Sequence, residues 1–218
     1  MSAPPVVAVV GPTATGKTAL AVALAHRLGG EVVNADSMQL YRGMDIGTAK
    51  PTPAERNGVP HHLLDLWHVR VPASVAEYRL RARAEVDRLR TAGVLPLLVG
   101  GSGLYVRAVL DELEFPGTDP AVRARLTEEL TAAGPAALHA RLTALDPAAA
   151  AAILPSNGRR VVRALEVIEL TGQPFTARLP EPAAHYPAVT VGLDRAPDEL
   201  DQRVARRVDA MWAAGFVD

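Results

Sequence analysis

The segment that most restricts the fold lies near the N-terminus, where the apolar run 6–10 leads directly into GPTATGKT, Gly11 to Thr18. The spacing G-x-x-x-x-G-K-T, set between an apolar strand and a helix rich in alanine and leucine, is typical of a phosphate-binding loop. Its backbone N–H groups and the N-terminus of the helix point at phosphate oxygens. The segment predicts a di- or triphosphate site, with positive charge from Lys17 and Mg2+ held by the Thr18 hydroxyl. The residues expected to contact phosphate are Gly11, Pro12, Thr13, Ala14, Thr15, Gly16, Lys17 and Thr18.

Strand and helix signals alternate on both sides of this loop. Strands are predicted at 6–10, 31–36 and 94–99, and helices at 18–28 and 74–92. The second helix begins after Ser74, and Glu77 three residues later completes the pattern of a capping box. This alternation predicts right-handed strand–helix–strand units and a parallel sheet. Ligands of such sheets gather at the carboxyl ends of the strands, so the phosphate loop, Asp36 and the turn at 100–103 should converge at one edge.

The pattern changes between residues 112 and 187, where strand signals vanish. Asp119-Pro120 and Asp146-Pro147 each predict a helix start with an aspartate cap and proline at the first helical position. Sheet character returns at 188–193, and a last helix is predicted at 197–214. We therefore predict an α/β protein: a P-loop NTPase-like parallel sheet flanked by helices (1–111 and 188–218), with an all-helical insertion (112–187). The sequence stops at residue 218 without an evident closing element, so we expect a missing C-terminal part.

Composition narrows the function classes. The 218 residues carry a net charge of −1 and include no cysteine, which rules out disulfides and thiolate chemistry. A nearly neutral chain binds nucleic acid only through a local basic patch. The apolar stretches are too short to span a bilayer, and the N-terminus has no basic segment of the kind that begins a signal peptide. We expect a cytoplasmic protein that does not act at a membrane.

Two polar residues follow predicted strands at the expected ligand edge. Asp36 ends the second strand, where its carboxylate can serve as a general base, as a group close to a magnesium ion, or as a helix cap. Ser102 lies in a glycine turn after the third strand; it donates to a phosphate oxygen or is an ordinary turn serine. The adjacent His61 and His62 point in different directions on a helix or a strand, and no third ligand has the spacing of a metal site.

Arginines gather in three places along the chain. Runs of this kind are usually solvated faces, and Glu166 and Glu169 partly neutralise the second one. Two of the runs fall in the helical insertion. If the insertion forms a lid over the site, these arginines can contact the phosphates of a polyanionic substrate. In the last helix, Arg203 and Arg207 share one face, and one of them is expected to reach a leaving group. The three runs are Arg123 with Arg125; Arg159, Arg160 and Arg163; and Arg203, Arg206 and Arg207.

Taken together, these segments resemble the bacterial tRNA dimethylallyltransferases, also called tRNA isopentenyltransferases, over essentially the whole chain. The phosphate loop alone is shared by many NTPases, whereas the run GMDIGTAKP is highly specific. Where this family usually has threonine, the sequence has Ser102, which keeps the hydroxyl; the family also continues well past residue 218. The matching segments are GPTATGKT, Asp36 to Gln39, YRGMDIGTAKP (Tyr41 to Pro51), PHHLLD (Pro60 to Asp65), LLVGGSGLY (Leu97 to Tyr105) and RRVVRALEV (Arg159 to Val167).

The resemblance implies a transferase that moves the dimethylallyl group of dimethylallyl diphosphate to N6 of the adenosine just 3′ of the anticodon. In this family Asp36 is the general base, while Lys17, Ser102, Mg2+ and one of Arg203 and Arg207 stabilise the departing diphosphate. The resemblance also implies a flipped target base, with tRNA and dimethylallyl diphosphate as partners. We expect a monomer. The positions expected to contact tRNA are Asp36, Ser37, Met38, Gln39, Ser102, Arg123 (with Arg125 as a substitute), Arg159, Arg160, Val161, Val162 and Arg163.

Two other functions use the same phosphate loop. An ATP-dependent small-molecule phosphotransferase would use the loop and Mg2+ for a phosphoryl group, with the helical insertion as its nucleotide lid. A nucleotide-gated binding module would use the loop as a switch, without catalysis. The two enzyme hypotheses differ in whether a prenyl group or a phosphoryl group is transferred.

Overall fold

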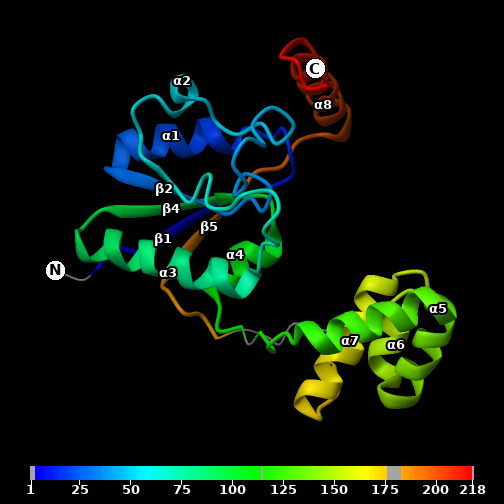
Figure 1. Ribbon diagram of the computed structural model, residues 1–218. Helices are drawn as coiled ribbons and strands as arrows, with labels where there is room; N and C mark the ends of the chain where they lie inside the picture. Colours follow the sequence, from blue (N-terminus) through cyan, green and yellow to red (C-terminus); the bar gives the residue numbers. More distant parts are fainter. Residues whose placement is uncertain (1–2, 114, 176–182, 218) are drawn as a thin grey trace. The chain divides into compact units, whose positions relative to one another are not determined.

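The computed structural model describes residues 3–113, 115–175 and 183–217. It divides into two compact units, one formed by Met1–Glu112 with Ala183–Asp218 and the other by Leu113–Pro182. The sequence placed the return to the sheet at 188, whereas 183–187 already belong to the first unit (Figure 1). Glu112 donates its N–H to the carbonyl of Ala183 at 2.8 Å. The segment that leaves this unit is therefore hydrogen-bonded to the segment that returns to it. The stretch 176–182 of the predicted insertion lies outside the described residues.

The first unit is built on a sheet that is parallel throughout its described strands, and this confirms the predicted P-loop NTPase-like α/β fold. The strand order is β3-β2-β4-β1-β5. The central strands are apolar and buried on both faces, which is typical of a parallel sheet covered by helices. The pairing of β3 with β2 was not predicted, because two residues are too few to show a pattern. The strands are β1 (Val6–Val10), β2 (Gly30–Asn34), β3 (His61–His62), β4 (Leu95–Gly100) and β5 (Ala188–Gly192).

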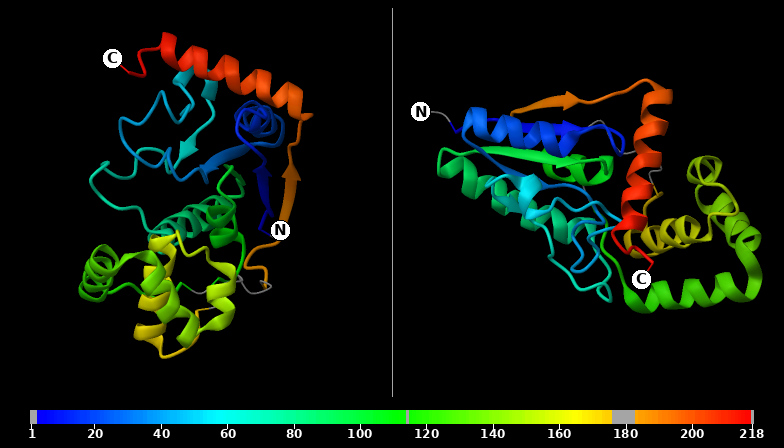
Figure 2. Two further views of the ribbon diagram at one scale, coloured as in Figure 1. Left: turned by 90° about the vertical axis from the view of Figure 1, so that its right-hand side faces the viewer. Right: turned by 90° about the horizontal axis from the view of Figure 1, so that it is seen from above.

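Helices cover both faces of the sheet. One face packs against α1 (Lys17–Leu28), and the other against α3 (Val75–Thr91) and α4 (Gly103–Leu110), as Figures 1 and 2 show. The start of α3 differs in one detail from the prediction. Ser74 accepts the N–H of Glu77 at 3.5 Å, but the Glu77 carboxylate pairs with Arg81 on the next turn, so the capping box is only half formed.

Two further helices belong to this unit. The short α2 (Pro53–Arg56) begins with a complete capping box between Thr52 and Glu55, which the sequence reading did not single out. The last helix, α8 (Pro197–Ala213), has no buried residue and lies across the end of the sheet where β5 ends (Figure 2). Within the parts of the chain that the structure describes, the helices are too short or too polar to cross a bilayer.

The described secondary structure of the second unit consists of helices, in the order α5 (Pro120–Leu145), α6 (Pro147–Ala152) and α7 (Gly158–Thr171). Asp119 and Asp146 cap α5 and α6 as predicted, each followed by proline at the first helical position. Gly134 interrupts α5 because its φ of 79° and ψ of 165° are not helical, a conformation open to glycine since it has no Cβ. All three helices contribute to a core of their own: α6 adds Ala149 and Ala150 to leucine and valine side chains of α5 and α7, namely Leu126, Leu138, Leu142, Val161, Val162 and Leu165.

Candidate active site

The phosphate loop joins the end of β1 to the start of α1, and its two glycines are required by its path. A Cβ on Gly11 would lie 2.4 Å from the carbonyl oxygen of Leu193, the residue after β5. Gly16 has φ of 100°, a conformation that side chains disfavour. The buried hydroxyl of Thr15 donates to the carbonyl of Pro12 at 2.9 Å and fixes the turn. These contacts hold the loop in a tight turn.

Lys17 places a cation inside this loop. Its Nζ donates to the carbonyls of Gly11 at 2.9 Å and Pro12 at 2.7 Å. Burial lowers the pKa of Lys17, the nearby carboxylate of Asp36 opposes that change, and the guanidinium of Arg207 lowers the pKa further. Three charged groups that are distant in the sequence thus act on one another at this edge of the sheet.

Asp36 lies two residues beyond β2, in a turn shaped by its own neighbours. Its N–H donates to Oδ1 of Asn34 at 3.0 Å, and its Oδ1 accepts the N–H of Met38 at 2.9 Å. The carboxylate therefore caps the turn with one oxygen and is half-buried beside the phosphate loop. The capping and chemical interpretations of Asp36 are compatible, because they use different lone pairs.

Ser102 connects the loop after β4 to the loop after β2. Its Oγ accepts the N–H of Ser37 at 3.3 Å and donates to the Ser37 hydroxyl at 3.2 Å. The two loops approach closely because Gly100 has no side chain: a Cβ there would lie 2.3 Å from the carbonyl oxygen of Ala35. The turn at 100–103 and Asp36 thus meet at the same sheet edge, as the parallel topology predicts.

Arginines from the C-terminal segment bind the outer side of the phosphate loop. Arg203 donates from Nε to the carbonyl of Ala14 at 2.6 Å, and Arg207 donates from Nη1 to the hydroxyl of Thr13 at 2.9 Å. Arg195, which sequence reasoning missed, donates from Nε to the carbonyl of Thr15 at 3.4 Å. Both arginines that the sequence proposed for the leaving group therefore reach the loop.

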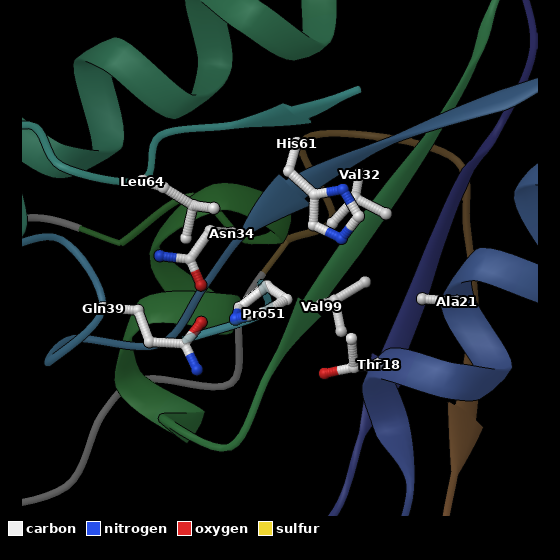
Figure 3. Close-up of a pocket in the computed structure, with 9 residues that line it drawn as sticks. All are labelled: Thr18, Ala21, Val32, Asn34, Gln39, Pro51, His61, Leu64 and Val99. Carbon is white, nitrogen blue, oxygen red and sulfur yellow. The ribbon is translucent and has the colours of Figure 1, made fainter. Parts of the chain in front are cut away.

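Lys17, Asp36, Ser102, Arg203 and Arg207 all border one open cavity of about 1250 Å³ in the first unit. The phosphate loop and the arginines of α8 form its polar wall, and Ile46, Met38 and Met211 add apolar surface. A second cavity of only about 20 Å³ lies beside it (Figure 3). Thr18 and Gln39 line both, and the smaller one has room for a single water molecule. The larger cavity has space for an organic diphosphate together with a nucleobase.

His61 and His62 form the edge strand β3 and do not line the large cavity. In β3, Nδ1 of His61 lies 2.9 Å from the carbonyl of Val59, and Nε2 of His62 lies 2.7 Å from Oε2 of Glu31. Burial lowers the pKa of His61. Among the described residues, no group of three or more histidine, aspartate or glutamate side chains is arranged to hold a metal ion.

In the helical unit the predicted tRNA residues separate into two sets. Arg159 and Arg160 are exposed at the start of α7, whereas the side chains of Val161 and Val162 lie in the core of the unit. Any contact from the valine side chains is therefore blocked. The exposed side chains of this stretch are those of Arg159 and Arg160.

Arg123 and Arg163 converge on Glu166, whose side chain is fully buried. Burial raises the pKa of Glu166, but hydrogen bonds from Arg123, Arg163 and Thr118 outweigh it and bring the pKa to about 2. Arg163 also donates to the carbonyls of Pro116 and Gly117 and so fixes the chain just before α5. Both guanidinium groups remain partly exposed while they hold this network together.

A parallel sheet whose first strand leads into a glycine loop and a helix, with cationic side chains around that loop, defines a P-loop phosphate-binding protein. Residues 39–218 match the family model described as IPP transferase. The chain belongs to this IPP transferase family, which confirms the resemblance found in the sequence.

Named relatives agree with this assignment. A tRNA dimethylallyltransferase of Salinispora arenicola is 72% identical over 212 residues, which are 97% of this chain and 62% of the relative. One from Streptomyces avermitilis is 69% identical, covering 99% of this chain and 69% of the relative. The chain thus spans roughly two thirds of the length of these relatives.

Solved structures give the same picture. The full-length tRNA isopentenylpyrophosphate transferase of Bacillus halodurans is 47% identical with a TM-score of 0.65, and the match covers 97% of this chain and 67% of that one. A eukaryotic dimethylallyltransferase, described as acting on tRNA, is 26% identical with a TM-score of 0.82 and is covered over 54% of its length. The described fold is that of the tRNA isopentenyltransferases.

Proposed function

We propose that this protein transfers the dimethylallyl group of dimethylallyl diphosphate to N6 of the adenosine that follows the anticodon in tRNA, and releases diphosphate. The observation that carries the proposal is the composition of the large cavity. Its wall contains both a phosphate loop and the carboxylate of Asp36. A prenyl transfer to an amine needs these two functions, an anion site for the leaving group and a base for the proton. The names of the relatives support the substrate pair.

The chemistry divides between the two sides of the cavity. The N6 lone pair attacks C1 of the dimethylallyl group as the C1–O bond breaks, and the bonding electron pair leaves with the diphosphate. Lys17, the loop N–H groups and the guanidinium of Arg207 stabilise the negative charge that develops on the diphosphate. Asp36 accepts the N6 proton with the carboxylate oxygen that does not bind Met38 N–H. Ser102, bonded to Ser37, orients the loop that carries Asp36.

The site fits a magnesium ion bound in the manner of P-loop proteins. Thr18 lies at the start of α1 and borders the large cavity. It also lines the small cavity, where Figure 3 shows its side chain. One hydroxyl and one carboxylate are a poor cage by themselves, but in such sites Mg2+ takes most of its ligands from phosphate oxygens and water. When bound, Mg2+ would neutralise charge on the leaving diphosphate. Thr18 is the residue that we propose to hold it.

The target base must leave the anticodon stack to reach a carboxylate at this depth, so we propose base flipping. Asp36, Ser37, Met38 and Gln39 form the loop that would receive the flipped adenine. In the helical unit, Arg159 and Arg160 are the exposed cations that we propose for contacts with the tRNA backbone. With tRNA as its acceptor, the reaction is assigned to the cytoplasm.

The test is a transfer assay with isotopically labelled dimethylallyl diphosphate and an unmodified tRNA that carries adenosine at the target position. A parallel reaction contains ATP and no prenyl donor. Label on the tRNA supports the proposal, and a tRNA with guanosine at the target position serves as the control. Turnover of ATP without prenyl transfer would favour the phosphotransferase instead. Because the relatives are longer, the assay includes a version extended with a relative's C-terminal residues.

A further inference from the structure

The GMDIGTAKP run is the most distinctive segment of the sequence, yet the proposed reaction gives it no role. In the structure, residues 44–50 form a loop that also borders the cavity, through Asp45, Ile46, Ala49 and Lys50. The loop ends at Lys50, whose side chain is only 3% exposed. A buried ammonium group away from the phosphate site calls for a physical explanation, because burying a charge is costly unless it is fully paired.

Lys50 is fully paired. Its Nζ donates to the carbonyl of Tyr41 at 2.7 Å and to one carboxylate oxygen each of Asp45 and Asp65 at 2.5 Å. An ammonium group has three donors, and here it meets three acceptors. The planar fork of an arginine cannot reproduce this convergent geometry. The chain otherwise relies on arginine: Lys17 and Lys50 are the two lysines among its 23 basic residues.

The backbone around this cluster is strained. Ala49, Leu63 and Asp65 have φ of 46°, 63° and 59°, the left-handed region that L residues rarely occupy. Such conformations persist only where surrounding contacts enforce them, and they gather at functional sites. Asp65 is one of the strained residues, and its carboxylate is held by Lys50. The Lys50 cluster therefore holds two separate segments, 45–50 and 63–65, in a shape they would not adopt alone.

The loop 44–50 links Gln39 to Arg207 through one backbone atom. The carbonyl oxygen of Thr48 accepts from Nε2 of Gln39 at 3.1 Å and from Nη2 of Arg207 at 3.1 Å. Gln39 belongs to the loop that would receive the adenine, and Arg207 binds the phosphate loop through Thr13. The shared carbonyl sets the position of both side chains at once.

We propose that Lys50 is a positioning residue: it holds loop 44–50 as a bridge that aligns Arg207 on the diphosphate side with Gln39 on the adenine side. The alignment of these subsites rests on the proposed transferase function, but the bridge itself does not. Release of Lys50 would let Thr48 move, and Arg207 would lose one of its two partners. Substitution of Lys50 should therefore weaken diphosphate binding, although the Lys50 side chain bonds Tyr41, Asp45 and Asp65 and not the phosphate loop.

The first experiment examines the cluster without any activity measurement. The native protein is treated with acetic anhydride, and the modification of its two lysines is mapped by mass spectrometry against the urea-unfolded chain. We expect Lys50 to be protected in the native protein and to become reactive in Asp65→Asn. Labelling of native Lys50 at the rate of the unfolded chain would overturn the inference.

The second experiment measures binding of inorganic pyrophosphate by calorimetry in Lys50→Met, Arg207→Ala and the double variant. Because Lys50 acts through Arg207, we expect the single Lys50 change to weaken binding roughly fivefold and to add nothing once Arg207 is removed. General destabilisation would instead weaken both backgrounds alike. Binding equal to wild type in Lys50→Met, or independent effects that multiply, would overturn the proposal.

Two variants guard against misfolding and nonspecific charge effects. Asp45 is 62% exposed, and Asp45→Asn removes one of the two negative charges on Lys50 while Lys50 keeps Asp65, so a smaller effect in the same direction is expected. Arg81→Met breaks the exposed ion pair with Glu77 and should leave binding unchanged. If pyrophosphate binding behaves as expected but no prenyl transfer occurs, the bridge stands and the proposed function falls. An Asp45→Asn protein that melts like wild type and binds pyrophosphate equally well would count against the bridge.

Discussion

The guanidinium of Arg207 donates to the hydroxyl of Thr13 at 2.9 Å, joining residues 194 positions apart in the sequence. The contact brings α8 over the phosphate loop, so the C-terminal segment completes a site that begins with the first strand. Arg203, one helical turn earlier, binds the adjacent Ala14 carbonyl. A loop that contributes its own cation at Lys17 thereby gains two more from a distant helix.

This contact predicts that Arg207→Ala weakens pyrophosphate binding by about tenfold, because charge-assisted hydrogen bonds are among the stronger ones in proteins. Arg207→Lys should restore only part of the affinity, since one ammonium cannot span Thr13 and the Thr48 carbonyl as the guanidinium does. Calorimetry at two salt concentrations measures both. Arg70→Ala is the matched control, because it removes an exposed arginine that does not line the cavity. Equal affinity in Arg207→Ala and wild type would remove Arg207 from the diphosphate site.

The second prediction concerns the base. Asp36→Asn keeps an acceptor for the Met38 N–H, so the turn should survive, but an amide does not take up the N6 proton. We expect prenyl transfer to fall by about 10² to 10⁴-fold, the usual contribution of general base catalysis. Pyrophosphate binding should be unchanged or slightly tighter, because a carboxylate near Lys17 is lost. Single-turnover transfer and calorimetry are the measurements, with the exposed Asp201→Asn as control. Loss of pyrophosphate binding would show that Asp36 serves the metal instead.

The third prediction uses the buried carboxylate of the helical unit. Glu166→Gln leaves two guanidinium groups without a counter-ion, and both are partly exposed, so we expect a loss of about 2–3 kcal/mol in the free energy of unfolding at neutral pH. The pKa of Glu166 is lowered from 4.5 to about 2 in the folded protein. Its stabilisation is therefore complete above about pH 4.5 and is lost as the pH falls toward about 2.

Urea unfolding of wild type and Glu166→Gln at several pH values measures this effect. The difference between the two proteins should shrink steadily between about pH 4.5 and about pH 2. Glu77→Gln, which neutralises an exposed carboxylate in an ion pair on α3, should change stability by less than about 0.5 kcal/mol at any pH. A constant difference between wild type and Glu166→Gln across this range would mean that the carboxylate is not ionised in the folded unit.

The fourth prediction separates contact residues from structural ones in the helical unit. Arg159→Ala and Arg160→Ala should each weaken tRNA binding and reduce the slope of log K against log salt by about 0.7, the value for one phosphate contact on a single strand. Arg163→Ala should mainly lower stability, because Arg163 fixes the chain at Pro116 and Gly117. Filter binding over a salt series, with Arg141→Ala as control in the same unit, measures the slopes. An unchanged slope in both Arg159→Ala and Arg160→Ala would remove α7 from the tRNA interface.

Much of the architecture could be predicted from local signals. The strand at 6–10, the phosphate loop and the aspartate caps at Asp119 and Asp146 each depend on residues within a few positions of one another. Such signals failed for β3, which is two residues long and exists because His61 and His62 pair with β2. At Ser74 the sequence pattern predicted a complete capping box, but only half of it forms, because the Glu77 carboxylate pairs with Arg81.

The sequence by itself determined the phosphate loop, the parallel strand–helix order and the family, because these reside in short contiguous patterns. Only the tertiary structure decided which charged side chains work together. It brought Arg207 to Thr13, buried Glu166 between Arg123 and Arg163, and closed Lys50 against two aspartates. The reason is physical: a charge acts on whatever lies within a few ångströms, and that neighbourhood is set by how the chain folds rather than by spacing along it.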